Sequence, residues 1–305
     1  MNQKKYRGII APVVTPLTES YKLDKGAMER IFGMFYEHSI SPFILGTTGE
    51  FASLSVDLKQ KYMRRAGKLK MQDTILYSGI SGNCFEESLE FGRFCMHHGA
   101  DVLVANLPSY YSLTESQMKK YFLDLVEMLR SPLVIYNIPA TTHMSIPLSL
   151  IDELSYHPDI IGIKDSERSE ERLHQSITLW KDRKDFSHFL GWAARSVTAL
   201  VGGSDGLVPS TANIAPEIYS EMLMAVEQND LENANKQQEL SNALGKIYQE
   251  GKSQGESLWA LKVLMEEKGL CESYMMPPLA GMSEEEKQKL KRSYLGFAHR
   301  EPQRK

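Results

Sequence analysis

Short apolar segments alternate with helix-forming segments along most of the chain, and this alternation limits the folds open to it. Eight segments read as strands because apolar and β-branched residues run together between turn residues. They are residues 8–14, 43–45, 74–79, 101–105, 132–136, 160–164, 188–190 and 205–208. Segments with an apolar face at helical spacing separate most of them, although none is identified between residues 136 and 160, and a strand recurs at intervals of roughly thirty residues. Eight such repeats predict a (β/α)8 barrel, the TIM barrel fold of the α/β class.

The last third of the chain differs because it holds helix-forming segments only. Four helices are expected there, at residues 215–228, 231–249, 256–268 and 284–294. We therefore expect one domain in residues 1–305, with the barrel in residues 1–213 and C-terminal helices in residues 214–305. A doubly wound open sheet is the competing fold. The barrel is favoured because the first strand lacks the G-x-G-x-x-G turn typical of dinucleotide-binding sheets.

Charge and cysteine content exclude several classes of function. A net charge of -4 gives no electrostatic basis for binding nucleic acid or an anionic membrane. No apolar run is long enough to cross a bilayer, and the amino terminus lacks the apolar region of a signal peptide. The three cysteines show no C-x-x-C spacing, so neither a zinc site nor a disulfide framework is expected. These features indicate a cytoplasmic protein that acts on small molecules.

One of the predicted strands ends on a lysine. The segment I-I-G-I-K-D-S at residues 160–166 reads as a strand buried on both faces, closed by Lys164. Lysine is almost never fully buried without a reason, and strand ends are where α/β proteins place their chemistry. A partly desolvated ammonium loses its proton more easily, which makes the Lys164 amine a candidate nucleophile toward a carbonyl. Alternatively, Lys164 reaches solvent and pairs with Asp165 or Glu167. The strand alone does not decide between these readings.

A tyrosine ends the preceding strand. Neighbouring strands lie about 4.8 Å apart, so the Tyr136 hydroxyl is expected near the Lys164 amine, where it can carry protons. The alternative for Tyr136 is a core aromatic residue with a solvated hydroxyl.

The turn after the second strand suits an anion. Residues Gly46-Thr47-Thr48-Gly49 offer unpaired backbone N–H groups and two hydroxyls, although glycine and threonine also build ordinary loops. Tyr110 and Tyr111 follow the fourth strand and are the least specific of these residues. An amine, a proton carrier and a carboxylate cradle at one end of a barrel are what a Schiff base with a 2-oxo acid requires.

Six motifs along the chain extend this interpretation. They are A-P-V-V-T-P (11–16), G-T-T-G-E (46–50), P-S-Y-Y (108–111), Y-N-I-P-A (136–140), G-I-K-D (162–165) and A-N-I-A-P-E (212–217). Through them nearly the whole chain resembles the dihydrodipicolinate synthase/N-acetylneuraminate lyase family of pyruvate-dependent class I aldolases. The resemblance implies that Lys164 is the Schiff-base lysine and that Tyr136 is the proton shuttle.

The same resemblance implies further roles. Thr47 and Thr48 in the turn that begins at Gly46 would hold the pyruvyl carboxylate, and Gly191 and Val208 would line the pyruvate pocket. Tyr111, or Tyr110 beside it, would reach a neighbouring subunit's site. The family implies a homotetramer built from two tight dimers. It implies no metal and no organic cofactor, because the lysine imine is itself the electron sink.

Departures from the family patterns narrow the substrate. The synthase that condenses pyruvate with aspartate semialdehyde typically has an arginine where this chain has Thr141, and sialate lyases have an acidic pair where it has Ala193 and Ala194. The motifs look more like those of 2-keto-3-deoxy sugar-acid aldolases. Arg195 is read as capping a helix rather than binding a carboxylate, and His143 as a solvent-facing loop residue.

The expected function is therefore a carbon–carbon lyase that acts on pyruvate and a 2-keto-3-deoxy sugar acid or a similar 4-hydroxy-2-oxo acid. A dehydratase using the same imine stays open. Two other functions also stay open. One is a dihydrodipicolinate synthase that binds the second carboxylate with another residue, such as Arg195. The other is a non-catalytic barrel that binds a 2-oxo acid.

Overall fold

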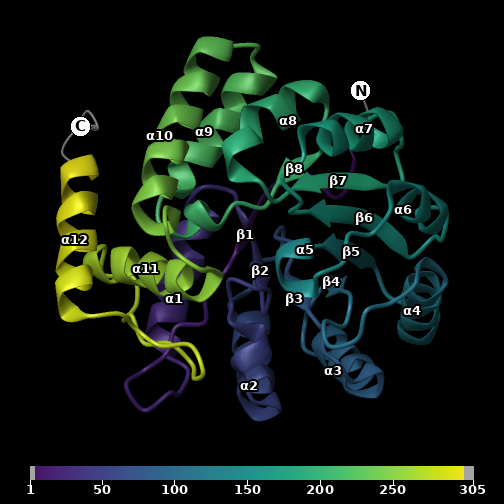
Figure 1. The fold of residues 1–305 in the computed structure, drawn as a ribbon, viewed down its shortest axis with the longest axis horizontal. Helices are drawn as coiled ribbons and strands as arrows, with labels where there is room; N and C mark the ends of the chain where they lie inside the picture. The colour runs from purple at the N-terminus through teal and green to yellow at the C-terminus, as the bar shows by residue number, and fades with distance from the viewer. Residues whose placement is uncertain (1–3, 299–305) are drawn as a thin grey trace.

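Eight short parallel strands pair in chain order and close into a barrel, as the alternating pattern predicted (Figure 1). The computed structural model describes residues 4–298. Each strand is almost wholly buried, because helices cover the outside of the barrel and side chains fill its interior. The strands are β1 (Gly8–Pro12), β2 (Ser41–Ile44), β3 (Tyr77–Gly79), β4 (Val102–Asn106), β5 (Leu133–Asn137), β6 (Ile160–Asp165), β7 (Ser187–Leu190) and β8 (Gly206–Leu207). The closing pair is β1 with β8.

Helices follow the strands and surround them. They are α1 (Lys25–Glu37), α2 (Val56–Leu69), α3 (Phe85–His97), α4 (Glu115–Leu129), α6 (Leu148–Leu154), α7 (Glu170–Trp180), α8 (Ser196–Gly202) and α9 (Pro216–Glu227). α2 and α4 begin at side-chain caps: Ser55 accepts a hydrogen bond from the Leu58 N–H, and Thr114 and Gln117 form both halves of a capping box. The expected boundary at residues 213 and 214 falls before α9, which packs against β1 and completes the eighth repeat.

Three further helices pack beside the barrel as a C-terminal helical region. They are α10 (Leu231–Gln249), α11 (Gln254–Glu267) and α12 (Glu284–Ala298), and Figure 1 shows them gathered on one side of the molecule. α11 is buried along most of its length, because it lies between α10, α12 and the short helix η3 (Ser210–Asn213). Among residues 4–298, no helix is both long and apolar enough to span a bilayer.

The connection between β5 and β6 differs from the prediction. Two helices, α5 (Pro139–Thr142) and α6, occupy a stretch for which no helix was expected. Both are short, and prolines at positions 139 and 147 lie at their starts, so the apolar pattern of a longer helix never develops there.

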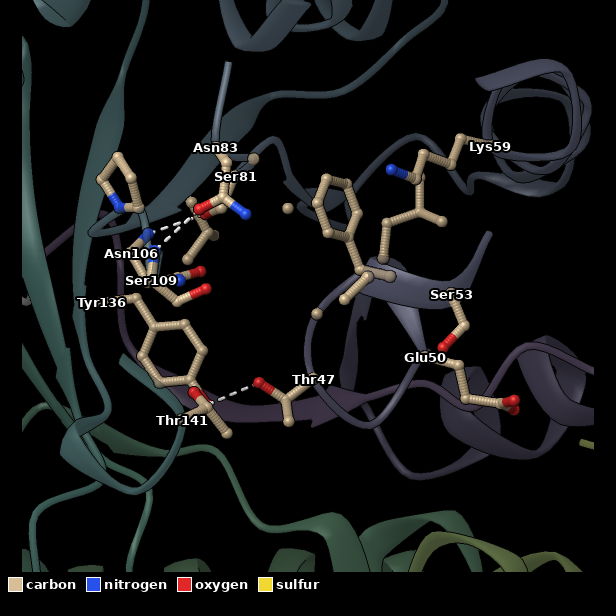
Figure 2. A pocket seen from close by; sticks show the side chains of 18 of the residues that line it. Thr47, Glu50, Ser53, Lys59, Ser81, Asn83, Asn106, Ser109, Tyr136 and Thr141 are labelled. Atoms are coloured by element: carbon tan, nitrogen blue, oxygen red, sulfur yellow. Dashed lines mark hydrogen bonds between the residues drawn. The ribbon is translucent and has the colours of Figure 1, made fainter. Parts of the chain in front are cut away.

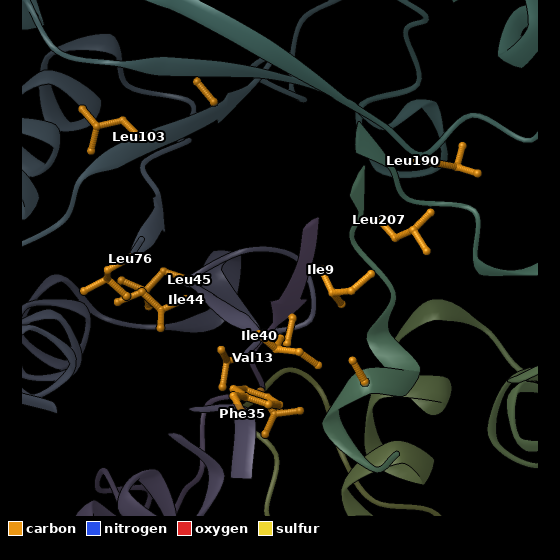
Figure 3. Close-up of a cluster of buried hydrophobic side chains, with 14 of the residues drawn as sticks. Ile9, Val13, Phe35, Ile40, Ile44, Leu45, Leu76, Leu103, Leu190 and Leu207 are labelled. Carbon is orange, nitrogen blue, oxygen red and sulfur yellow. The ribbon is translucent and has the colours of Figure 1, made fainter. Parts of the chain in front are cut away.

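The buried apolar residues form two separate clusters. The larger one lies between the barrel and its helices and includes Phe35, Leu76 and Leu103 (Figure 3). The smaller one fills the barrel itself and includes Phe43, Tyr136, Phe189 and Val208. The interior is therefore packed with side chains, and in barrels of this kind active sites lie at the end where the strands finish.

Candidate active site

Lys164 and Tyr136 lie side by side at the carboxyl ends of β6 and β5. The two residues are register partners across the strand pair, and Lys164 is only 5% exposed. The Lys164 Nζ lies 3.9 Å from the centroid of the Tyr136 ring and 5.0 Å from that of Phe43. Among the described residues, no carboxylate lies within ion-pair distance of this ammonium. The amine is therefore surrounded by aromatic faces and left without an anionic partner.

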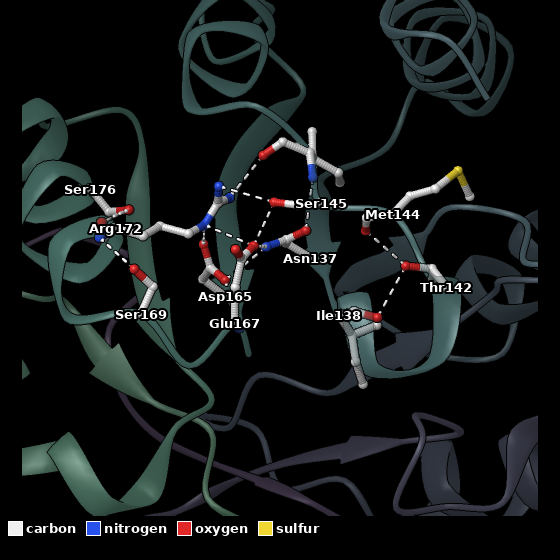
Figure 4. A network of polar contacts seen from close by, with 11 residues as sticks. Asn137, Ile138, Thr142, Met144, Ser145, Asp165, Glu167, Ser169, Arg172 and Ser176 are labelled. Atoms are coloured by element: carbon white, nitrogen blue, oxygen red, sulfur yellow. Dashed lines mark hydrogen bonds and ion pairs between the residues drawn. The ribbon is translucent and has the colours of Figure 1, made fainter. Parts of the chain in front are cut away.

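Asp165 and Glu167 do not pair with Lys164 because both face Arg172 instead. The Arg172 Nε lies 2.6 Å from the Asp165 Oδ2 and 3.5 Å from the Glu167 Oε2. The Asn137 amide donates to Asp165 at 2.9 Å and to Glu167 at 3.0 Å, and Ser145 donates to Glu167 at 2.6 Å. Figure 4 shows these side chains meeting between the ends of β5 and β6. The network fixes the strand ends that carry Tyr136 and Lys164.

Burial and nearby charge shift the pKa values of Asp165 and Glu167 in opposite directions. Burial raises the pKa of Asp165, and the Arg172 charge and the hydrogen-bond donors oppose that rise. For the less buried Glu167, burial also raises the pKa, but hydrogen bonds from Ser145 and Asn137 and the charge of Arg172 outweigh it, so the net pKa is lowered. Glu167 is therefore held as a carboxylate that is already paired.

The turn from Gly46 to Gly49 approaches the same site from β2. The Gly46 carbonyl accepts hydrogen bonds from the N–H groups of Gly49, at 3.0 Å, and Phe51, at 3.4 Å. Buried Thr15 donates its hydroxyl to the Gly49 carbonyl at 2.6 Å. The Thr47 hydroxyl lies 3.4 Å from the Tyr136 hydroxyl. The turn therefore presents its threonines next to Tyr136.

The residues flanking this turn have left-handed backbones. Leu45 and Glu50 both have φ near +57°, a conformation that costs a side-chain-bearing residue energy. Glu50 is held by Lys262 of α11, with which it forms a fully buried ion pair, and its second carboxylate oxygen accepts from the Met276 N–H at 2.7 Å. The C-terminal helical region thus secures a strained turn at the barrel mouth.

A cavity of about 510 Å³ opens above Lys164 and is called here the lysine cavity. Its lining includes five residues singled out from the sequence, namely Thr47, Thr48, Tyr136, Gly191 and Val208, together with the lysine itself. Gly191 is required for shape, because a Cβ there would lie 2.1 Å from the Ser166 hydroxyl oxygen. Further lining comes from Arg168 after β6, from Lys252 between α10 and α11, and from Gln254 at the start of α11.

A second cavity, the side cavity, lies on the other side of Thr47 and Tyr136. It measures about 610 Å³ and is lined mainly from β2, β3, β4 and the loops that follow them (Figure 2). Gly46 and Thr141 lie here and not in the lysine cavity. Lys59 also lines it, with its ammonium 3.7 Å from the Phe51 ring, and burial lowers the pKa of that amine although Glu87 opposes the shift. Of these two cavities, the lysine cavity is the one that Lys164 lines, so it is the candidate active site.

Several residues discussed from the sequence lie outside the lysine cavity. Tyr110 and Tyr111 are 76% and 73% exposed and contact each other edge to face, and His143 is exposed at the end of α5. Arg195 pairs with Glu170 and lies over the Trp192 ring. Among residues 4–298, no three histidine, cysteine or carboxylate side chains gather as metal ligands do.

Comparison with known proteins agrees with this geometry. The profile of the Dihydrodipicolinate synthetase family matches residues 5–294. The chain belongs to this family. Its members are carbon–carbon lyases, so this dihydrodipicolinate synthetase family protein is an enzyme of that class.

Relatives of the family extend over nearly the whole chain. An uncharacterized DapA-like lyase from Thermococcus kodakarensis is 31% identical over 289 residues, which is 92% of this chain and 97% of the relative. A probable 2-dehydro-3-deoxy-D-pentonate aldolase, YjhH of Escherichia coli K12, is 27% identical and covers 94% of this chain and 96% of its own length. The crystal structure of YagE from E. coli K12 in complex with pyruvate has a TM-score of 0.91 at 24% identity, covering 96% of this chain and 99% of YagE. That likeness establishes the shared fold.

Sequence reasoning assigned no role to several residues that shape this family member's site. The residues without a predicted role are Arg172, Arg168 and Lys252. For Arg172 a signal existed, since a cation seven residues beyond Asp165 lies on the first turn of the helix that follows β6. Lys252 lies 88 positions after Lys164 and meets the same cavity only through the packing of α10 and α11.

Proposed function

We propose that this enzyme is a class I aldolase that acts through an imine between Lys164 and the 2-oxo group of pyruvate. One observation carries the proposal: a buried amine without a carboxylate partner lies against Tyr136, at the base of a cavity lined by hydroxyls. A buried, unpaired lysine is costly to keep in a fold, which favours a chemical role for it.

In the cleavage direction the reaction starts at the carbonyl of a 4-hydroxy-2-oxo acid. The neutral Lys164 amine attacks C2, and Tyr136 donates its proton to the departing C2 hydroxyl, so that water leaves and a protonated imine forms beside the deprotonated Tyr136. Tyr136 accepts the proton of the C4 hydroxyl as the C3–C4 bond breaks, and the bonding electrons move into the imine to give an enamine. An aldehyde leaves. Protonation of the enamine at C3 and addition of water then release pyruvate and restore the amine.

The carboxylate of pyruvate is assigned to the turn that holds Thr47 and Thr48. Thr48 is 7% exposed and lines the lysine cavity, and Thr47 lies within 3.4 Å of the Tyr136 hydroxyl. Hydroxyls and backbone N–H groups in a tight turn suit a carboxylate. YagE, which shares this fold, was solved in complex with pyruvate, and this supports pyruvate as the ligand.

The second product is assigned as the aldehyde of a 2-keto-3-deoxy sugar acid or a similar compound. Ala193 and Ala194 line the cavity without polar side chains, and Thr141 lies in the side cavity. The name of the E. coli relative, a pentonate aldolase, supports the sugar-acid class. Arg195 lies outside the cavity and is paired, so it gives no support to a synthase that would use it to bind a second carboxylate.

The proposal includes an assembly and needs no cofactor. We assign Tyr110 and Tyr111 to a subunit contact, because two adjacent and largely exposed tyrosines are typical of interfaces. Tyr111 would then serve a neighbouring site within a cytoplasmic homotetramer. No metal or organic cofactor enters the steps above, since the imine accepts the electrons.

Borohydride reduction in the presence of pyruvate tests the imine directly. We expect a stable adduct on Lys164, with the mass of reduced pyruvate, in intact and peptide mass spectrometry. Incubation with borohydride alone is the control. If the folded protein gave no adduct, the aldolase proposal would be rejected, and a non-catalytic barrel that binds a 2-oxo acid would be favoured. If the adduct forms, turnover with aspartate semialdehyde equal to that with sugar-acid aldehydes would replace the sugar-acid assignment with the synthase.

Tyr136→Phe tests the proton shuttle. Removing the hydroxyl should lower kcat by about 10²–10⁴-fold, the usual contribution of general acid–base catalysis. The fold should be retained because the ring still packs against Phe43 inside the barrel. Tyr219→Phe is the matched control: it removes a buried hydroxyl that bonds Ser241 in the helical region, and its kcat should change less than threefold. Equal kcat values for the two variants would contradict the role of Tyr136.

A further inference from the structure

The wall of the lysine cavity carries more positive than negative charge. Its described lining includes three cations, Lys164, Arg168 and Lys252, and a single carboxylate, Glu167. Lys164 lies at the base, where the strand ends. The other two cations come from different parts of the chain, one from the loop after β6 and one from the connection between α10 and α11.

Glu167 does not offset these charges. Its carboxylate already accepts hydrogen bonds from Ser145 and Asn137 and faces the Arg172 guanidinium. The pairing also fixes its direction, toward the ends of β5 and β6 (Figure 4). Neither Arg168 nor Lys252 forms an ion pair with Glu167 among the described residues.

Lys252 is a largely buried cation with weak partners. Its side chain is 12% exposed, and the closest carboxylate, Glu286 of α12, lies 3.9 Å away. Among the described residues, its ammonium forms one hydrogen bond, to the Glu250 carbonyl, which is long at 3.5 Å. An ammonium removed from water is normally compensated at closer range, so this one has capacity for an anionic ligand.

Arg168 lies at the outer part of the same cavity. It is exposed, four residues beyond buried Lys164, and forms no ion pair or hydrogen bond with the described residues. Tyr248 lines the same cavity from α10. Burial raises the pKa of the Tyr248 hydroxyl, and the Arg168 charge is among the causes that lower that pKa. Arg168, Tyr248 and Lys252 therefore line one cavity from separate parts of the chain.

We infer that the substrate carries a second anionic group, a carboxylate or a phosphate, at the end remote from its 2-oxo acid, and that Arg168 and Lys252 bind it. The inference rests on the proposed function, because Lys164 and the threonine turn fix which end of the substrate lies at the base. The inference also describes the aldehyde product, because the second anionic group would stay on the aldehyde after cleavage. A guanidinium and an ammonium suit either anion, through charge-assisted hydrogen bonds.

The test compares aldehydes in the condensation direction at saturating pyruvate. Glyceraldehyde 3-phosphate is compared with glyceraldehyde, and succinic semialdehyde with butanal, so that the two pairs separate phosphate from carboxylate. We expect kcat/KM to be at least about tenfold higher for the anionic member of one pair, the size of one or two charge-assisted hydrogen bonds. The pair with the larger ratio identifies the anion.

Variants show whether these two residues cause the preference. Arg168→Gln and Lys252→Gln should each lower kcat/KM about tenfold more for the anionic aldehyde than for its neutral counterpart. Lys236→Gln is the control, because it removes an equal charge from an exposed position of α10 outside both cavities. In Lys236→Gln, the ratio of kcat/KM for the anionic aldehyde to kcat/KM for the neutral one should match that of the unmodified enzyme.

Borohydride trapping of pyruvate separates the two levels of failure. If Lys164 is trapped but neither anionic aldehyde is preferred, the second anion site is wrong and the aldolase proposal stands. A preference that survives both substitutions, or that falls equally in Lys236→Gln, would also overturn the assignment to Arg168 and Lys252. If no adduct forms, the proposed function fails, and this inference fails with it.

Discussion

Lys164→Met is expected to abolish turnover while preserving the fold. The variant keeps an unbranched apolar side chain against Phe43 and Tyr136 but removes the amine that forms the imine. Loss of a covalent nucleophile typically lowers kcat by about four orders of magnitude or more. Steady-state assay of pyruvate release from a sugar-acid substrate measures the effect. Lys164→Met should also give no borohydride adduct with pyruvate.

The stability of the same variant provides the control. Lys164 is buried and has no carboxylate partner, so a methionine of similar length should leave the free energy of unfolding unchanged or raise it. Lys164→Arg completes the comparison, because it keeps the positive charge and lacks a nucleophilic amine. Both variants should be inactive if the amine is the reacting group. Activity above about 1% of wild type in folded Lys164→Arg would show that the charge suffices, and it would refute the imine.

The barrel could be predicted because each of its parts is encoded locally. Strands buried on both faces appear as continuous apolar runs, and caps such as Ser55 and Thr114 mark where helices begin. The failure between β5 and β6 has the same origin. α6 is seven residues long, which is too short for an apolar period to be distinguished from a loop.

The candidate site was predictable only where it coincides with strand ends. Lys164 and Tyr136 each close a strand, and barrel geometry alone brings adjacent strand ends together. Lys252 and Lys262 meet the site through helix packing over long stretches of chain, which no local pattern encodes. Glu50 stood inside a quoted motif, yet its partner lies 212 residues away. The C-terminal helical region therefore contributes to the site in ways that the sequence did not reveal.

Breaking the ion pair between Glu50 and Lys262 should have the largest effect on stability. The two side chains are 0% and 1% exposed, and the Lys262 ammonium also donates to the Tyr274 carbonyl at 2.7 Å. Lys262→Met leaves the Glu50 carboxylate buried without its cation. Removing one partner of a buried pair typically costs about 3–5 kcal/mol, which we expect to see in the free energy of unfolding from chemical denaturation.

A double-mutant cycle separates the pair from its surroundings. Glu50→Gln with Lys262→Met removes both charges, and it should be more stable than Lys262→Met alone. Lys61→Met is the control, because Lys61 pairs with Asp57 on the exposed surface of α2 and such a pair contributes about 0–1 kcal/mol. If Lys262→Met and Lys61→Met lowered the free energy of unfolding by the same small amount, the buried ion pair would contribute no more to stability than an exposed one.

The same variants should also affect pyruvate binding, because Glu50 ends the turn that carries Thr47 and Thr48. Without Lys262, Glu50 keeps its hydrogen bond from the Met276 N–H but loses the ion pair that helps to hold its left-handed backbone. We expect KM for pyruvate to rise in the folded Lys262→Met variant, with a smaller change in kcat, since Lys164 and Tyr136 are held separately by β5, β6 and the Arg172 network. A fall in kcat at unchanged KM would instead place the effect of the ion pair on the reacting groups.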